Sequence, residues 1–308
     1  MHLGKLVSYV LITEYLDSSM DFLFRFSKNC SDQDLVSLTL VGAILLIYNF
    51  VGLIRLVRCM RQAIRLASDR TSDPIVRVYA AEKIDKEFGE IRSCVLNSWK
   101  YRSILTEKLD GHAYGNFYHV YLHPWITQTW NYLRMCQLKL HEIIRDESLK
   151  MLGRNLSSLS TSIVQARIRS SEHAIQKICS EICASVPQVM GQIRFPDIPG
   201  EEATPMTCID DFFDPEDLKS KLHPPGTFFD PSWPTGLHEL ILPLYSVGKI
   251  GPRDLKDWAV RQLHFIALRM GTHQALALAN ELVDLRDAAP VAESEGYTNM
   301  TRLVPADL

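Results

Sequence analysis

The sequence predicts an all-α protein, organised as a single large, bundle-like domain of many helices with a long acidic, proline-rich loop. Apolar residues recur at steps of three and four over most of the chain, which is the spacing of one helix face. No alternating β-pattern or hairpin-turn signal of any length appears beside it. Hydrophobic residues make up 46% of the chain and charged residues 22%, as in ordinary globular domains. We expect the helical domain to cover residues 1–286 and a flexible tail to cover 287–308.

Two helices are expected at the N-terminus. Over residues 1–28 one face is apolar and consists of Tyr9, Ile12, Leu16, Met20 and Leu23. A second helix begins near Ser31 and contains Leu35–Ile54, a run of twenty residues without a charge. Such a run is long enough to cross about 30 Å of hydrocarbon. We expect it to be buried in the core of the helical domain instead.

A membrane-spanning segment is the alternative for Leu35–Ile54. Asp32 and Asp34 precede the run, and four arginines follow it, at Arg55, Arg58, Arg61 and Arg65. This asymmetry would place the C-terminal bulk of a single-pass membrane protein in the cytoplasm.

The middle of the chain predicts three further helices. Asp73 and Pro74 begin the first, since aspartate accepts hydrogen bonds from free amides and proline needs no partner there. It is expected to run to about Leu109. A long helix over about 117–152 follows from the apolar line Ile126, Trp130, Leu133, Leu140 and Ile144. A capping box of Ser162 and Gln165 opens the third, which is expected to stop at Pro187.

Residues 187–236 predict a largely irregular insert. They contain nine of the fifteen prolines, and nine acidic residues against three Lys or Arg. Such a composition buries too little apolar surface to offset the entropy of ordering the chain. Helices are expected to resume over Leu237–Val247, after Gly251-Pro252, and, past an interruption at Gly271, over Ala275–Leu285.

The chemical motifs of common enzymes do not occur in the sequence. G-x-x-x-x-G-K-[ST], G-x-G-x-x-G, G-x-S-x-G and H-E-x-x-H are all absent. His119 and His123 would share a helix face, but two imidazoles without a third ligand favour surface or capping histidines. Cys179 and Cys183 favour core packing. We therefore predict a protein that is not an enzyme, with no catalytic, cofactor-binding or metal-binding residues.

Charge and cysteine content limit the partners. The net charge of −3 offers no basic surplus for nucleic acid, so no direct nucleic-acid binding is predicted. The seven cysteines contain no C-x-x-C pair and are interpreted as free thiols in a reducing compartment. The aromatic stretch Tyr114–Trp130 contains no Lys or Arg, which favours core packing over a nucleic-acid platform.

One segment has the composition of a docking element. Cys208–Leu218, with the sequence CIDDFFDPEDL, interleaves acidic and apolar side chains. Acidic charge keeps such a segment solvated while its aromatic rings stay available to a partner groove. Its candidate residues are Asp210, Asp211, Phe212, Phe213, Asp214, Asp217 and Leu218. The competing interpretation is an acidic surface loop whose phenylalanines pack back onto the domain.

Four blocks of sequence occur in a specific order. They are YHVYLHPWITQTWNYLRMCQLKLHEII (118–144), IVQARIRSSEHAIQKICSEICASVPQVMG (163–191), LILPLYSVGKI (240–250) and DWAVRQLHFIALRMGTHQALALANEL (257–282). Their distinctive positions are Trp130, Asn131, Arg134, His141, Glu142, Ile182 to Pro187, Pro243 to Tyr245, Gly271, Gln274 and Ala275. Over roughly 110–285, the chain thereby resembles the C-terminal regulatory domain of fungal zinc-binuclear-cluster (six-cysteine) transcription factors.

The resemblance implies a nuclear, all-helical, non-catalytic regulatory domain, often part of a dimer. The family's DNA-reading element is an N-terminal six-cysteine zinc cluster with a basic linker, and this chain has neither. We therefore expect a regulatory protein that acts through protein–protein contacts, in a homodimer or with an intact zinc-cluster factor. The regulated genes could be a fungal secondary-metabolite set. The chain is interpreted as a truncated family member, a mispredicted gene product or a stand-alone regulatory domain.

Overall fold

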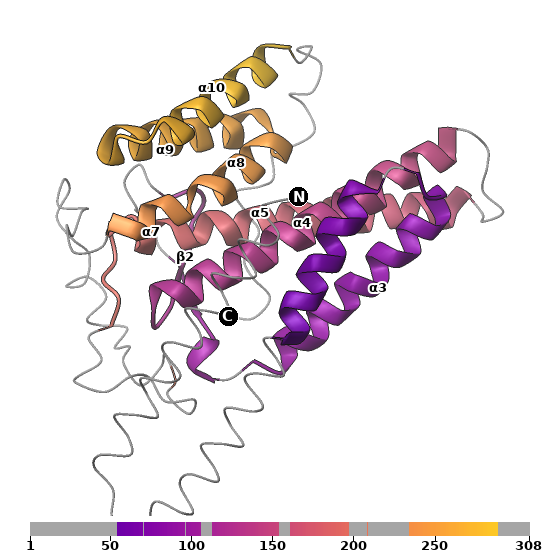
Figure 1. Cartoon of the computed structure of the whole chain (residues 1–308), viewed down its shortest axis with the longest axis horizontal. Helices are drawn as coiled ribbons and strands as arrows, with labels where there is room; N and C mark the ends of the chain where they lie inside the picture. Colours follow the sequence, from indigo (N-terminus) through magenta and orange to yellow (C-terminus); the bar gives the residue numbers. More distant parts are fainter. Residues whose placement is uncertain are drawn as a thin grey trace, which may run out of the picture.

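The computed structural model describes residues 54–69, 71–95, 97–105, 113–153, 161–196, 208 and 234–288. These residues are predominantly helical and contain one small two-stranded sheet, so the predicted all-α class is confirmed (Figure 1). The expected helix over 1–28 lies outside the described residues, as does all of Leu35–Ile54 except its last residue. The predicted tail 287–308 lies outside them from 289 onward, and its first two residues, Asp287 and Ala288, are helical, contrary to prediction.

Residues 54–68 are helical and lie beside α3 (Pro74–Ser93) in Figure 1. The two helices are antiparallel, because Arg55 pairs with Glu90 at 3.3 Å while Cys59 Sγ lies 3.2 Å from Glu87. Helix α3 begins as predicted: the Asp73 side chain accepts a hydrogen bond of 2.8 Å from the Ile75 amide.

The predicted end of that helix near Leu109 is wrong. Helix α3 ends at Ser93, and the chain continues through a 3-10 turn, η1 (Asn97–Trp99), into strand β1 (Arg102–Leu105). Strand β1 pairs antiparallel with β2 (Phe117–Val120), with Leu105 opposite Phe117.

The sheet also corrects the predicted helix start at 117 and the expected absence of strands. All four residues of β2 are buried. A strand that is buried on both faces shows no alternation of apolar and polar residues, so its sequence cannot be told from a buried helical segment.

Two long helices form the centre of the molecule. They are α4 (Pro124–Gly153) and α5 (Thr161–Val189), which pack along each other (Figure 1). Helix α5 begins one residue before Ser162, so the predicted capping box lies inside its first turn. The helix also continues past Pro187, contrary to prediction, because amides beyond the proline still bond back: Met190 N to Val186 O at 2.8 Å and Gln192 N to Pro187 O at 2.9 Å.

Four C-terminal helices follow. They are α7 (Pro234–Glu239), α8 (Ile241–Ile250), α9 (Arg253–Met270) and α10 (His273–Ala288). The predicted helix over 237–247 is therefore divided at Leu240. The predicted break at Gly271 is confirmed, since this residue ends α9 with φ of +64°, which glycine adopts at little cost. Figure 1 shows α8, α9 and α10 gathered on one side of α5.

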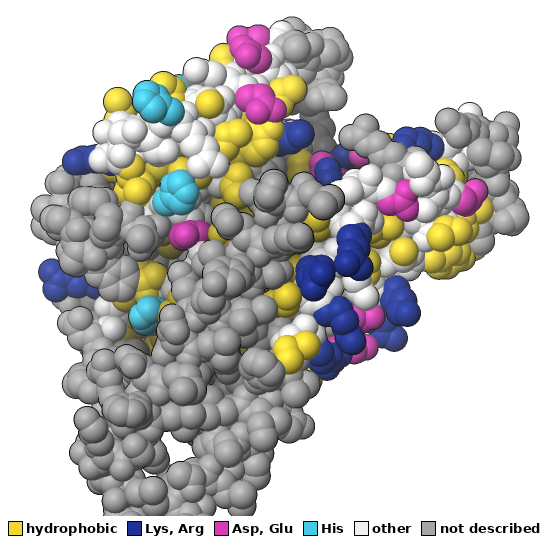
Figure 2. All heavy atoms as spheres, in the orientation of Figure 1, with side chains coloured by type: hydrophobic (Ala, Val, Ile, Leu, Met, Phe, Trp, Pro, Cys, Tyr) yellow, Lys and Arg dark blue, Asp and Glu magenta, His cyan; other side chains and the backbone are white. Residues whose placement is uncertain are grey.

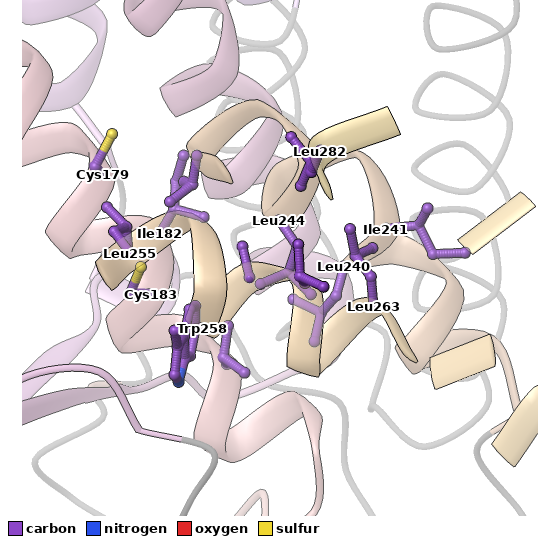
Figure 3. Packing of buried hydrophobic residues seen from close by; sticks show 14 of the residues in the cluster. Cys179, Ile182, Cys183, Leu240, Ile241, Leu244, Leu255, Trp258, Leu263 and Leu282 are labelled. Atoms are coloured by element: carbon purple, nitrogen blue, oxygen red, sulfur yellow. The ribbon is translucent and has the colours of Figure 1, made fainter. Parts of the chain in front are cut away.

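The described residues form two main hydrophobic cores. The first lies between helix 54–68, α3, the sheet and α4, and contains Phe88, Tyr121 and Leu140 among others. The second lies between α5 and the C-terminal helices (Figure 3). It includes Cys179, Ile182, Cys183, Leu240, Ile241, Leu244, Leu255, Trp258, Leu263 and Leu282.

Helix α4 contributes to both cores. Leu138 on α4 belongs to the second core, although Leu140, two residues further along the same helix, belongs to the first. In the described part of the chain, no helix combines the length and apolar character needed to cross a membrane.

Candidate functional site

A buried arginine organises the polar interior. Arg134 on α4 has no exposed surface. Its Nη1 donates hydrogen bonds to the Tyr121 hydroxyl at 2.7 Å and to Asn131 Oδ1 at 3.2 Å, and its Nε donates to Glu181 Oε2 at 3.2 Å. Burial alone would lower the pKa of Arg134, but neighbouring oxygens, that of Tyr121 foremost, outweigh burial and raise it. The guanidinium is therefore a permanent charge inside the protein.

His119 on β2 faces the same guanidinium. Its Nδ1 lies 3.3 Å from Arg134 Nη2 and 3.2 Å from the Tyr121 hydroxyl. Burial, reinforced by the charge of Arg134, lowers the pKa of His119 well below its usual value. The imidazole is therefore neutral, and Nδ1 is its acceptor because arginine can only donate.

Aromatic rings enclose the guanidinium. Its carbon lies 5.0 Å from the centre of the Tyr101 ring and 5.6 Å from that of Trp130. These two rings meet edge to face at 5.2 Å. Trp130 is itself held by a 2.8 Å hydrogen bond from Nε1 to the Trp99 carbonyl. Such cation–π contacts are strongest where water is excluded, as it is here.

Helix α5 closes the network from the other side. Asn131 Nδ2 donates to Ser185 Oγ at 2.9 Å, and Gln188 brackets the backbone of Tyr121 with hydrogen bonds of 2.8 and 3.0 Å. The network around Arg134 thus joins the sheet, α4 and α5 by hydrogen bonds between buried groups. We call it the Arg134 network.

Some of the positions that carry the resemblance lie in the Arg134 network, and others lie elsewhere in the fold. Trp130, Asn131, Arg134 and Ser185 lie in the Arg134 network. His141 instead faces α3, with Nε2 3.5 Å from Asp85 Oδ2, and Glu142 accepts a 2.8 Å hydrogen bond from Lys139. The sequence marked Trp130 and Arg134 by their pattern, and His119 only as a surface or capping histidine. It did not mark Glu181 and Tyr121, which lie outside α4.

A second buried ion pair holds the first core together. Arg77 on α3 pairs with Glu147 on α4, and the side chains of both are nearly fully buried. Arg77 also donates to the Leu66 carbonyl at 3.4 Å, so one side chain connects α3, α4 and helix 54–68.

The fold separates the two histidine candidates and buries the two cysteine candidates. His119 lies in β2 and His123 precedes α4, so the two do not share a helix face. The interpretation of His119 as a surface or capping histidine is wrong, because its side chain is buried. Among the described residues, no group of three or more His, Cys, Asp or Glu side chains could hold a metal ion. Cys179 and Cys183 are fully buried in the second core, as predicted. Burial raises the pKa of Cys179 to about 12, so it is a protonated thiol at neutral pH.

The predicted docking residues Asp210, Asp211, Phe212, Phe213, Asp214, Asp217 and Leu218 lie outside the described residues. Cys208, just before them, is described and is half-buried against the first core.

The surface of helix 54–68 carries an exposed basic strip. Arg58, Arg61 and Arg65 are exposed and three or four residues apart, so they lie on one side of the helix. We call them the arginine face. Figure 2 shows Lys and Arg side chains gathered over this helix and α3, with acidic side chains between some of them. The sequence showed these arginines only as the flank of an uncharged run.

Comparison with protein-family models, curated proteins and solved structures finds no match for this chain. The resemblance to fungal regulatory domains therefore stays a prediction.

Proposed function

We propose that the protein is a transcription-factor-like regulatory protein that works in the nucleus through protein–protein contacts, without a DNA-binding domain of its own. The observation that carries this proposal is the Arg134 network. The W-N-x-x-R side chains and Ser185 are used to hold a helical scaffold together, because they bond to one another in the interior. In this proposal the scaffold presents its outer helix faces to a partner.

The partner is a second copy of the chain or an intact zinc-cluster transcription factor. Docking would use the segment over Asp210–Leu218, whose acidic and aromatic residues suit a groove on the partner. In this proposal the zinc cluster and the DNA contacts belong to the partner.

Affinity purification of the tagged full chain from fungal nuclear extract, together with light scattering of the pure protein, tests this proposal. We expect either a homodimer mass or a captured zinc-cluster factor. A matched variant with Phe212→Ala and Phe213→Ala should lose the captured factor while keeping its helical circular dichroism. A strictly monomeric protein that captures no such factor would contradict the proposal.

A single-pass membrane protein with the span Leu35–Ile54 is the second candidate, and the exposed arginine face favours it. Three unneutralised arginines directly after an uncharged run are typical of a cytoplasmic flank. Extraction of fungal membranes at alkaline pH separates the candidates, since a spanning protein stays with the lipid pellet and a nuclear regulator is released.

A further inference from the structure

The arginine face is a charged surface without a counterpart in the described part of the chain. Arg58 and Arg65 are seven residues apart, so the strip is about 10 Å long at 1.5 Å per residue. The opposite side of the same helix is buried in the first core, through Leu56, Val57, Cys59, Met60 and Ala63. The helix is thereby fixed to the domain, and its three arginines project from a rigid support.

Neighbouring carboxylates neutralise only the beginning of this helix. Arg55 pairs with Glu90 of α3 at 3.3 Å, and Glu87 is engaged by the Cys59 thiol at 3.2 Å. None of the three arginines of the face forms an ion pair with another described residue. Lys83 and Lys86 are also exposed, on helix α3, which runs antiparallel beside helix 54–68.

We propose that residues 209–218 of the same chain dock on the arginine face. This acidic–aromatic segment carries five carboxylates, at Asp210, Asp211, Asp214, Glu216 and Asp217. The charges are complementary in sign and number: the segment has five carboxylates, and the arginine face together with Lys83 and Lys86 has five cations. Arginine also stacks on aromatic rings, which suits the two phenylalanines of the segment.

The fold places the residue before the segment at the first core. Cys208 is half-buried against the first core, and helix 54–68 forms part of that same core. The acidic residues begin two positions after Cys208. Ten extended residues span up to about 35 Å, which exceeds the length of about 22 Å of the fifteen-residue helix.

Docking of this kind is reversible. Ion pairs at a protein surface are individually weak and are screened by salt, so the contact depends on several of them together. A partner that takes the segment would displace it from the arginines. The same segment is the docking element of the proposed function. The contact with the arginine face needs no partner protein, because it forms within one chain.

A binding measurement in trans tests the contact. The host is the full chain with residues 209–218 replaced by a Gly/Ser sequence of equal length, and the probe is a fluorescent peptide of residues 209–218. We expect the peptide to bind this host in low salt. The host with R58Q, R61Q and R65Q should bind it at least tenfold more weakly. The matched control carries R169Q, K177Q and R261Q, three exposed cations on other helices, and should bind as the host does.

Competition and charge reversal complete the test. The intact chain should bind the peptide at least tenfold more weakly than the host does, because its own segment occupies the face. A host with R58E, R61E and R65E should bind a peptide whose five acids are replaced by lysine.

Three results would overturn the proposal. One is equal loss of binding in the control and the arginine variant, and another is equal binding by intact chain and host. The third is failure of the peptide to bind while phosphatidylserine vesicles bind the host through the same arginines, which would assign the face to a membrane. If the peptide binds the arginine face but the full chain forms no dimer and captures no zinc-cluster factor, the proposed function is contradicted and the docking proposal is not.

Discussion

At the scale of single residues, the interior of this protein depends on charges that are fully enclosed. Arg134 has no exposed surface and its partner Glu181 is nearly buried, with Nε and Oε2 3.2 Å apart. Removing one member of a buried pair leaves the other without compensation for its lost hydration. The second nearby cation, Arg92, lies 3.9 Å from Glu181 and cannot replace the lost hydrogen bonds.

Arg134→Met should therefore lower the free energy of unfolding by about 3–5 kcal/mol. Urea titration followed by circular dichroism measures the loss. Arg169→Met on the exposed side of α5 is the control and should change stability by less than about 0.5 kcal/mol. Adding Glu181→Met to Arg134→Met should recover part of the loss; a further loss of equal size would show that the charges do not act as a pair.

His119 predicts how stability depends on pH. Its pKa is far below the usual value in the folded protein, so the folded state does not take up the proton that the unfolded state binds near pH 6.5. The stabilisation that results from the neutral His119 is complete above about pH 6.5. As pH falls below that value, the free energy of unfolding decreases by up to about 1.4 kcal/mol per pH unit. Urea titrations between pH 7 and pH 5 measure this slope.

His119→Gln should flatten the slope, whatever it does to stability at pH 7. Equal slopes for His119→Gln and the unmodified protein would contradict a neutral buried imidazole.

At the scale of elements, glycine positions show where helices approach closely. A Cβ on Gly248 of α8 would lie 2.5 Å from Leu282 Cδ1 on α10 and 3.1 Å from Ala259 Cβ on α9. Gly89 of α3 is the opposite case, since a Cβ there would have no neighbour within 4 Å.

Gly248→Ala should destabilise the protein by about 1–3 kcal/mol, because the added methyl group forces three packed helices apart. Gly89→Ala should stabilise it by about 0.5–1 kcal/mol through helix propensity alone. Thermal unfolding of the two variants measures both. The same sign for both would mean that α8 does not contact its neighbours as closely as described.

Element boundaries show what could be predicted from the sequence. The start of α3 and the break between α9 and α10 were predictable, because Asp73-Pro74 and Gly271 act through their own backbone chemistry. The strands β1 and β2 were not, because the fully buried β2 shows no alternation and each strand depends on pairing with another segment of the chain. The Arg134 network was unpredictable for the same reason: the sequence shows one arginine on a helix, not the three elements that surround it.

At the scale of the whole molecule, the two cores share helix α4. Leu138 and Leu140 lie two residues apart on α4 but belong to different cores, and the Arg134 network lies where α4, α5 and the sheet meet. Unfolding of one core therefore removes helix residues against which the other core packs.

Phe88→Ala in the first core and Leu244→Ala in the second should each cost about 2–5 kcal/mol. Both residues are fully buried. Hydrogen exchange followed by mass spectrometry should show α3 and α9 losing protection together in either variant. Loss confined to the helix nearest the substitution would show that the cores unfold separately.

The packing of α4 against α5 also decides how the chain can be divided. A cut in the segment between α4 and α5 separates Arg134 from Glu181 and Asn131 from Ser185, so each half would expose the partner surface of the other. Split reporters and shortened bait fragments made at that segment would therefore measure reassembly of the halves as well as any foreign partner. Fragments that keep residues 124–189 in one piece avoid that confusion.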